Sequence, residues 1–384
     1  MPDNKQKAPV RTSTELAADP CLIPVWDPAV PFPSHEEMCD LDVVTHITVE
    51  RAQPGGYYYL HEAAIAHHRG RFYMAWANHR TRETGDHDEL IRGCTSADAV
   101  NWSEPEIWAQ PPLIGSTSFN HPLLFAHGGR LYGFFVCWRE EHRPITEVFI
   151  LNDSTGAWEH QSGSAIPGFV PFCTPQRMPD GNWLIGGENW WYDAAVAISD
   201  GEDLTRWRMI TIPRPEALKI LYPESAVVDY GGGHLVAVCR PYSGTNPLLP
   251  ISDSVMPTAP TAESFDGGHT WTSLGLGNFP LADSQPFAGR LSTGQNYLLT
   301  NSLEEGRGLL SIAVTGPEGG LFRRVFKVRH QHYPLRRLFG NAVGKTTEWS
   351  YPNAFEHEGK LYVAYSQGKE DCVLSIIPVE VLAV

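Results

Sequence analysis

The eight residues 264–271, Ser-Phe-Asp-Gly-Gly-His-Thr-Trp, constrain the fold of this chain more than any other stretch. The two adjacent glycines can adopt the positive φ angles of a tight turn, and Asp266 can accept hydrogen bonds from the turn amides. Trp271 can fold back over the turn as an apolar cover. Two looser copies occur at 95–102 and 199–207, each between two apolar runs. A recurring turn predicts a recurring structural unit.

The rest of the sequence contains a matching repeat. Each unit opens on a polar or aromatic residue and continues with an apolar strand, a glycine turn and a second apolar strand. The six openings are His61, His121, Thr174, Tyr222, Gln285 and Tyr351. Their spacing of about 50 to 65 residues approaches the roughly 40–50 residues of a four-stranded propeller blade with its loops. The pattern therefore predicts an all-β propeller of six blades, with a seventh blade within 318–349 as the alternative.

The N-terminal part of the chain divides into an arm and a closing strand. Residues 1–40 are rich in Pro, Asp and Glu, and we expect them to pack over the outside of the barrel or to fray. Residues 42–51 alternate in polarity as a strand does, and we expect them to pair with 372–382. This pairing would close the ring and remove an exposed sheet edge. We therefore assign 41–384 to a single β-propeller domain.

Charge and composition limit the partners and the compartment. The chain has 29 Lys and Arg against 44 Asp and Glu, a net charge of −15, which disfavours nucleic acid and anionic membranes as partners. No stretch approaches the roughly 18 consecutive apolar residues of a membrane span. The polar N-terminus has no signal-peptide pattern, and the seven scattered cysteines lack CxxC spacing, so we expect a cytoplasmic protein. The absence of HxxxH and HExxH spacing leads us to expect neither a metal nor a cofactor.

Residues 264–271 match the Asp box, SxDxGxTW, of the sialidase-like (BNR-repeat) β-propellers. The resemblance covers most of 55–382. Asp boxes of these propellers lie in outer hairpins, far from the ligand-binding mouth. The motif is therefore specific for the fold, whereas the activity depends on other residues.

In a propeller, residues that begin the first strands and end the second strands converge on the central mouth. There Glu224 and Arg240 flank a strand, a glycine turn and a second strand, which resembles a sialidase segment. Arg307 resembles the third sialidase arginine, and Tyr351 resembles the nucleophilic tyrosine. Asp86 lies on the loop where sialidases carry their acid/base, and could protonate a leaving oxygen; alternatively, it belongs to a solvated acidic loop.

The first blade departs from the sialidase pattern. Sialidases open it with Arg-Ile-Pro, whereas this chain has His61 followed by Glu62. A neutral imidazole does not replace a bidentate guanidinium on a carboxylate, which disfavours sialic acid as the substrate. We expect His61 and His79 to be adjacent at the mouth and to be joined there by His121, where histidines could transfer protons. This cluster resembles propellers that act on uronic-acid glycans, namely ulvan lyases and rhamnosyl-glucuronate lyases and hydrolases; the alternative is that these histidines only bond between blades.

The sequence thus predicts an exo-acting glycoside hydrolase for an acidic, uronic-acid-containing oligosaccharide. The alternatives are a lyase that cleaves by β-elimination, with His61 and His79 near the uronate C5 and Arg240 on its carboxylate, and a noncatalytic glycan-binding propeller. The predicted catalytic residues are His61, His79, Asp86, Glu224 and Tyr351. The predicted substrate-binding residues are Arg240, Arg307, His121, Arg139, Trp190, Tyr242, Gln285 and Asn301. Trp190 is included because neighbouring side chains of a Trp-Trp-Tyr strand segment face opposite ways, so that at least one lines the mouth.

Overall fold

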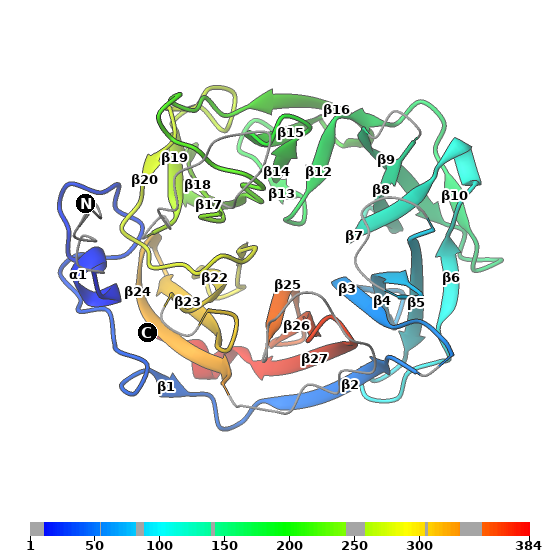
Figure 1. Ribbon diagram of the computed structural model, residues 1–384, viewed down its shortest axis with the longest axis horizontal. Coiled ribbons are helices and arrows are strands. Elements are labelled where there is room, and N and C mark those ends of the chain that lie inside the picture. The colour runs from blue at the N-terminus through cyan, green and yellow to red at the C-terminus, as the bar shows by residue number, and fades with distance from the viewer. Residues whose placement is uncertain are drawn as a thin grey trace, which may run out of the picture.

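The computed structural model describes residues 11–53, 55–81, 88–139, 143–242, 258–303, 306–330 and 348–384. These residues form six β-sheets of four or five strands each, arranged around a central axis (Figure 1). The all-β, six-bladed prediction is confirmed. The only described helical segments are α1 (Ser13–Ala17) and the 3₁₀ turns η1 (Leu113–Gly115) and η2 (Val379–Leu382). In the described part of the chain, no helix has the length and apolar character needed to cross a membrane.

Each blade is a meander whose first strand lies nearest the axis. Blade 1 contains β3 (Tyr59–His68), β4 (Arg71–His79), β5 (Leu90–Ser96) and β6 (Glu106–Ala109). Blade 2 contains β7 (Ser118–His127), β8 (Arg130–Trp138), β9 (Pro144–Leu151), β10 (Trp158–His160) and β11 (Ile166–Pro167). Blade 3 contains β12 (Phe169–Pro171), β13 (Gln176–Arg177), β14 (Trp183–Asn189), β15 (Ala194–Asp200) and β16 (Asp203–Thr211). Blade 4 contains β17 (Ala226–Gly231), β18 (His234–Val238), β19 (Pro260–Ser264) and β20 (Gly275–Leu276). Blade 5 contains β21 (Phe287–Arg290), β22 (Asn296–Asn301), β23 (Leu310–Gly316), β24 (Gly319–Arg329) and β1 (Cys39–Asp40). Blade 6 contains β25 (Trp349–His357), β26 (Lys360–Gln367), β27 (Asp371–Pro378) and β2 (Thr45–Arg51).

The ring closes through strands from the two halves of the chain. β2 pairs antiparallel with β27, with a register that runs from Thr45 opposite Ile376 to Arg51 opposite Asp371. The predicted closure by the N-terminal strand is therefore confirmed. The region named for a seventh blade instead supplies β24 to blade 5 and the start of β25 to blade 6. Residues 331–347 of that region lie outside the described residues.

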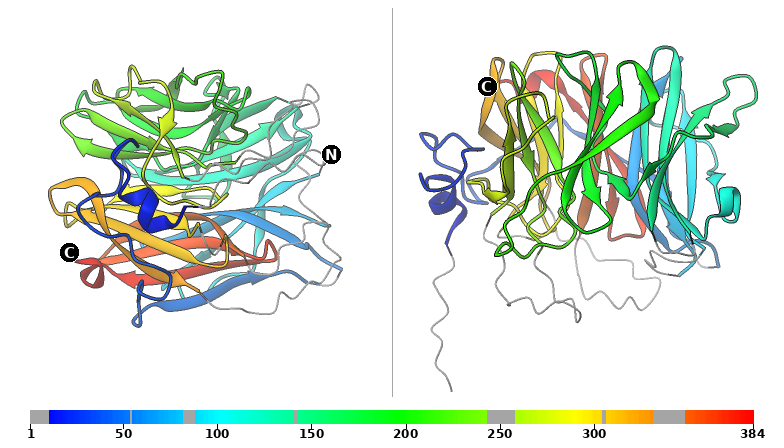
Figure 2. Two further views of the ribbon diagram at one scale, coloured as in Figure 1. Left: turned by 60° about the vertical axis from the view of Figure 1, so that its left-hand side comes forward. Right: turned by 90° about the horizontal axis from the view of Figure 1, so that it is seen from above.

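The described part of the arm packs beside blades 4 and 5, where Figure 2 shows α1 outside the ring. Trp26 is fully buried there, and its ring packs edge-to-face against that of Phe279 at a centroid distance of 6.3 Å. The Asn278 side chain accepts hydrogen bonds from the backbone of Val25 and Trp26 and donates to Ala17 O and Trp26 O. One buried amide thus satisfies four backbone groups of the arm, which fixes the arm against the outer strands.

The turn at 264–271 joins β19 to β20 at the outer edge of blade 4. Ser264 Oγ accepts a hydrogen bond from Gly268 N at 2.8 Å, and Asp266 Oδ1 accepts one from Thr270 N at 2.8 Å. Trp271 Nε1 donates to Gly268 O at 2.9 Å, and its ring packs into the apolar core. The two looser copies lie in the corresponding outer hairpins of blades 1 and 3. The repeated turn is therefore part of the blade scaffold.

Candidate active site

The innermost strands of blades 1, 2 and 6 share one irregularity. The pairing of β3, β7 and β25 with their neighbours shifts at the same distance from the hairpin turn. At these bulges Glu62, His121 and Tyr351 have positive φ angles of 58°, 42° and 57°. Such angles in residues other than glycine cost about 1–3 kcal/mol and cluster at functional sites. All three side chains line one central cavity.

The central cavity has a volume of about 600 Å³, and every blade contributes to its wall. The wall is a mixture of ionisable, amide and aromatic side chains, which can bind and orient a polar ligand. It consists of Tyr59, Glu62, Glu89, Asn120, His121, Trp138, Pro144, Val170, Phe172, Glu188, Asn189, Trp190, Tyr192, Tyr222, Glu224, Arg240, Tyr242, Asp283, Arg307, Tyr351 and Lys369.

A buried tyrosine, glutamate and arginine form the centre of this wall. Tyr351 Oη donates a hydrogen bond to Glu224 Oε1 at 2.5 Å. Arg240 Nη1 donates to the same carboxylate oxygen at 2.7 Å and to Tyr351 Oη at 3.0 Å. A carboxylate that accepts the phenol proton and a cation beside the phenol oxygen both favour formation of a phenolate. The arrangement can therefore activate the Tyr351 oxygen as a nucleophile.

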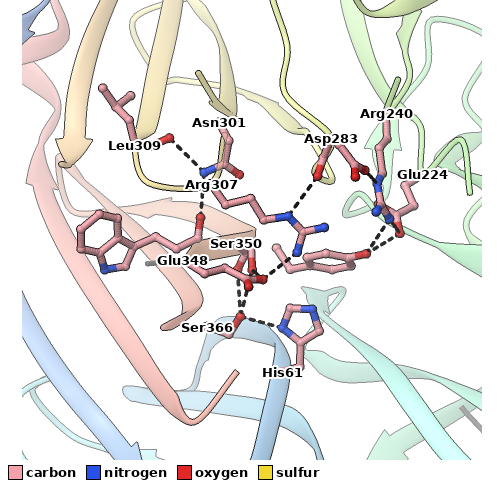
Figure 3. Close-up of polar contacts among 12 residues, drawn as sticks. His61, Glu224, Arg240, Asp283, Asn301, Arg307, Leu309, Glu348, Ser350 and Ser366 are labelled. Carbon is pink, nitrogen blue, oxygen red and sulfur yellow. Dashed lines mark hydrogen bonds and ion pairs between the residues drawn. The ribbon is translucent and has the colours of Figure 1, made fainter. Parts of the chain in front are cut away.

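A second arginine lies beside the first, and Asp283 orients both (Figure 3). Arg240 Nε donates to Asp283 Oδ1 at 2.6 Å, whereas Arg307 Nε donates to the Asp283 carbonyl oxygen at 3.0 Å. Arg307 Nη1 also donates to Glu348 Oε1 at 2.6 Å. Within the described residues, Nη2 of neither arginine takes part in a hydrogen bond. Two rigidly held guanidinium groups thus border the cavity and each retains a donor nitrogen for an anionic ligand.

Glu224 is coupled to a second buried carboxyl group, that of Glu188. The backbone N of Glu224 donates to Glu188 Oε2 at 3.2 Å. Burial, and then the charge of Glu224, raises the pKa of Glu188 above its ordinary value of 4.5. Burial also raises the pKa of Glu224, while Arg240 and Tyr351 oppose this shift. The pair therefore retains a proton at a pH where an isolated carboxyl group would be ionised.

Blades 1 and 2 contribute a second group of ionisable side chains. His121 Nε2 lies 3.2 Å from Glu62 Oε1, and the His121 backbone N donates to Glu62 Oε2 at 2.7 Å. Glu89 is 1% exposed, and its Oε2 lies 3.4 Å from Ser118 Oγ and from Asn120 Nδ2. These side chains can hold and transfer protons at the cavity. Among the described residues, no group of three or more His, Cys, Asp or Glu side chains is arranged to hold a metal ion.

The structure brings seven of the predicted site residues together in the cavity wall, and they come from five blades. These seven are Tyr351, Glu224, Arg240, Arg307, His121, Trp190 and Tyr242. The others lie elsewhere, for reasons that differ from one residue to the next.

His61 does not reach the cavity, contrary to the expectation that it opens the first blade. It is fully buried, its Nδ1 lies 2.6 Å from Ser366 Oγ, and its ring packs at 4.2 Å from that of Tyr351. The residue equivalent to His121 and Tyr351 is Glu62, one position later. Because side chains of a strand alternate between faces, this shift of one residue moves His61 behind the wall. His61 is thus a neighbour of Tyr351 that can position its ring.

His79 also differs from its expected place. It pairs with Tyr59 across the hairpin, whereas His61 pairs with Ala77, so the two histidines are not cross-strand neighbours. His79 is absent from the described lining of the cavity, and its Nδ1 accepts a hydrogen bond from Thr81 N at 3.2 Å.

Three predicted binding residues have structural contacts instead. Asn301 is fully buried and its amide donates to Leu309 O and Trp349 O, which links blades 5 and 6. Gln285 donates to Phe172 O at 3.2 Å beneath the cavity. Arg139 pairs with Glu147 at 2.7 Å and lines a separate groove. Asp86 lies outside the described residues.

Several cavity residues were not singled out from the sequence. Glu89 lies three residues after Asp86 in the sequence, and its place directly before β5 was the available signal. Lys369 lies in the hairpin between β26 and β27, and Asp283 lies in the connection before β21. Neither stands at a strand end of the kind used for the prediction, so no sequence signal identified them.

Comparisons with known proteins agree with this architecture. Residues 70–363 match the BNR repeat-like domain, which is more than half of the chain. The chain belongs to the BNR repeat-like domain family. No curated protein matches this family member.

Solved structures resemble it at low sequence identity. A protein of unknown function from Dyadobacter fermentans has a TM-score of 0.59 at 15% identity, covering 87% of this chain and 99% of that one. Trypanosoma rangeli sialidase has a TM-score of 0.60 at 13% identity, with coverage of 88% of this family member and 60% of the sialidase. Hadza microbial sialidase Hz136 has a TM-score of 0.63 at 12% identity, with coverage of 88% and 69%. These likenesses show a sialidase-like β-propeller fold, and the chain spans about three fifths of the Trypanosoma enzyme.

Proposed function

We propose that this protein is an exo-acting glycoside hydrolase for an acidic, uronic-acid-containing oligosaccharide. The observation that carries the proposal is the 2.5 Å hydrogen bond from Tyr351 Oη to Glu224 Oε1, with Arg240 donating to both groups. In this mechanism Glu224 accepts the phenol proton while Tyr351 Oη attacks the anomeric carbon. A tyrosine nucleophile with a carboxylate base is the arrangement by which sialidases depart from the two-carboxylate scheme of other glycosidases.

The leaving oxygen requires a proton when the glycosidic bond breaks. Glu89 lies three residues after Asp86 in the sequence, and it lies in the cavity wall. We assign the acid to this segment before β5, with Glu89 as its described candidate. Water then attacks the glycosyl-tyrosine and gives its proton to the Glu89 carboxylate, while Tyr351 leaves the sugar and takes its proton back from Glu224. All three side chains are thereby restored.

The two arginines support an acidic substrate. Arg240 and Arg307 line the cavity and are oriented by Asp283, and Nη2 of each makes no hydrogen bond among the described residues. A sugar carboxylate can accept hydrogen bonds from both guanidinium groups. Glu62 stands where His121 and Tyr351 stand in their blades, so the arginine with which sialidases open the first blade has no counterpart there. We therefore favour a uronate over sialic acid.

The Glu62 and His121 pair favours a second candidate function, β-elimination at a uronate. His121 would remove the C5 proton, the electron pair would form the C4=C5 double bond, and the C4–O bond would break. Tyr351 would give its proton to the leaving oxygen, and an arginine would neutralise the carboxylate. The 3.2 Å contact between Glu62 Oε1 and His121 Nε2 orients the imidazole for such a role.

Incubation with a panel of uronic-acid oligosaccharides and sialylated oligosaccharides tests these functions. Hydrolysis of the uronate substrates releases a saturated terminal sugar, detected by mass spectrometry, whereas elimination produces an unsaturated uronate that absorbs in the ultraviolet. The Tyr351→Phe variant serves as the control for contaminating enzymes. Binding of a panel member without turnover would overturn hydrolysis and favour a glycan-binding propeller, and activity on sialylated substrates alone would overturn the uronate assignment.

A further inference from the structure

A second cavity of about 850 Å³ runs between blades 2 and 3, beside the central cavity. The two cavities share Asn189 and Trp190 in their walls. An oligosaccharide whose terminal unit occupies the central cavity can therefore continue past Trp190 into this groove. We call it the blade 2–3 groove.

The shared wall is a rigid turn between β14 and β15. Asn189 Oδ1 accepts hydrogen bonds from the backbone N of Trp191 at 2.8 Å and of Asp193 at 3.1 Å. Trp190 N donates to Gly168 O at 2.8 Å, which ties the turn to the connection between β11 and β12. Trp190 and Trp191 lie edge to face at 6.2 Å, and Trp191 is 71% exposed within the groove. Two fixed indole rings thus form an aromatic wall of the kind on which sugar rings stack.

The groove wall also contains polar atoms without a hydrogen-bond partner among the described residues. Ser116 is 4% exposed, and its Oγ has no hydrogen-bond partner among the residues that the structure describes. Arg139 Nε is likewise buried without a partner within the described ranges, although its Nη2 pairs with Glu147. Arg143 also lines the groove. Buried polar atoms in native proteins normally have a partner, so these two atoms point to a polar ligand in the groove.

We propose that the blade 2–3 groove binds the sugar units that follow the terminal unit of an acidic oligosaccharide. The inference rests on the proposed function and assigns the leaving-group side of its substrate. Trp191 stacks on a sugar ring, Arg143 and Arg139 face uronate carboxylates, and Ser116 Oγ hydrogen-bonds a hydroxyl group. The groove makes a chain of several acidic units a better ligand than a disaccharide.

Isothermal titration calorimetry tests whether the groove binds these additional sugar units. The ligands are three ladders, each a series of oligosaccharides of two to eight units: oligogalacturonate, oligomannuronate and glucuronate-containing heparosan fragments. The proteins are the parent, Trp191→Ala, Arg143→Gln and the control Phe265→Ala, which removes an exposed ring from the outer hairpin of blade 4. We expect the parent to bind tetramers about tenfold more tightly than dimers on at least one ladder, given one stacking contact and one ion pair. Trp191→Ala should remove most of this gain, because it should weaken tetramer binding more than dimer binding. Arg143→Gln should reduce the gain, and Phe265→Ala should retain it.

The outcomes separate this inference from the proposed function. Equal affinity of the parent for dimers and longer chains, or an undiminished gain in Trp191→Ala, would overturn the groove assignment while dimer binding still supported the central site. Absence of binding on all three ladders would instead overturn the proposed function, and the groove assignment with it.

Discussion

Tyr351 Oη lies 2.5 Å from Glu224 Oε1, although the two residues are 127 positions apart and belong to blades 6 and 4. Both residues have positive φ angles, 57° for Tyr351 and 34° for Glu224. Two strained backbone positions thus hold the phenol and the carboxylate in contact. Strain of this kind persists only where the surrounding structure fixes it, as the blade packing does here.

Removal of the Tyr351 hydroxyl tests the nucleophile directly. We expect Tyr351→Phe to lower kcat by at least about 10²–10⁴-fold on a hydrolysed substrate, with Glu224→Gln in the same range, because the base and the nucleophile act as one unit. Initial rates provide the measurement. Tyr230→Phe is the matched control, since Tyr230 is a buried phenol outside the cavity whose hydroxyl has no partner among the described residues. Full kcat in a folded Tyr351→Phe enzyme would exclude the nucleophilic role.

His61 and His121 should respond differently to substitution. His61→Ala removes a buried ring that packs on Tyr351, so we expect a lower melting temperature, a loss of about 1–3 kcal/mol, and a pH–rate profile of unchanged shape. His121→Gln should change the shape of the profile if elimination is the reaction, because His121 lies in the cavity wall. Thermal melts of both variants and their kcat across a pH series distinguish a positioning role from a role in proton transfer. A changed profile in His61→Ala with an unchanged melt would contradict the positioning role.

Arg240→Lys should weaken binding of an acidic ligand. Arg240 donates to Asp283 through Nε and to both Glu224 and Tyr351 through Nη1, a geometry that a lysine ammonium does not reproduce. We expect loss of one charge-assisted hydrogen bond, about 1.5–3 kcal/mol or roughly ten- to a hundredfold in Kd. Titration with a uronate oligosaccharide measures this, with an uncharged oligosaccharide of equal length as control. Equal losses for both ligands would show that the arginine only shapes the cavity.

Glu188→Gln should flatten the pH dependence of stability. Because burial raises the pKa of Glu188, the native state holds a proton that the unfolded state loses near pH 4.5. The contribution of this group is therefore complete below the unfolded pKa and is lost as pH rises through the native pKa. Glutamine keeps the neutral shape at every pH, so the variant should lose less stability than the parent towards alkaline pH. Denaturant unfolding of both proteins over a pH series measures their stability. An equal dependence of stability on pH in the parent and the variant would refute the raised pKa of Glu188.

The outer hairpin of blade 4 should affect stability alone. Asp266→Ala removes acceptors for the Thr270 backbone and hydroxyl groups, and Trp271→Ala removes a ring from the core. We expect losses of about 1–2 kcal/mol for the aspartate and about 3–5 kcal/mol for the tryptophan. The kcat should stay at the parent value below the melting transition. A folded variant with reduced kcat would link the hairpin to the site.

The sequence by itself indicated the propeller, its closure and the outer turns, and it favoured six blades over the alternative of seven. The reason is local: the alternation of β2 residues, the glycine turns and the Asp box each depend on neighbours within about ten positions. It also indicated Glu224, Arg240 and Tyr351, because the ends of inner strands converge wherever blades repeat.

Only the tertiary structure decided which side of each inner strand faces the cavity. A bulge at one position places Glu62 in the wall and His61 behind it, and this choice depends on pairing with a neighbouring strand. Asp283 and Lys369 enter the site from connections whose paths follow from packing between blades. Strand periodicity therefore predicts where blades meet, whereas register and loop packing select the side chains that meet there.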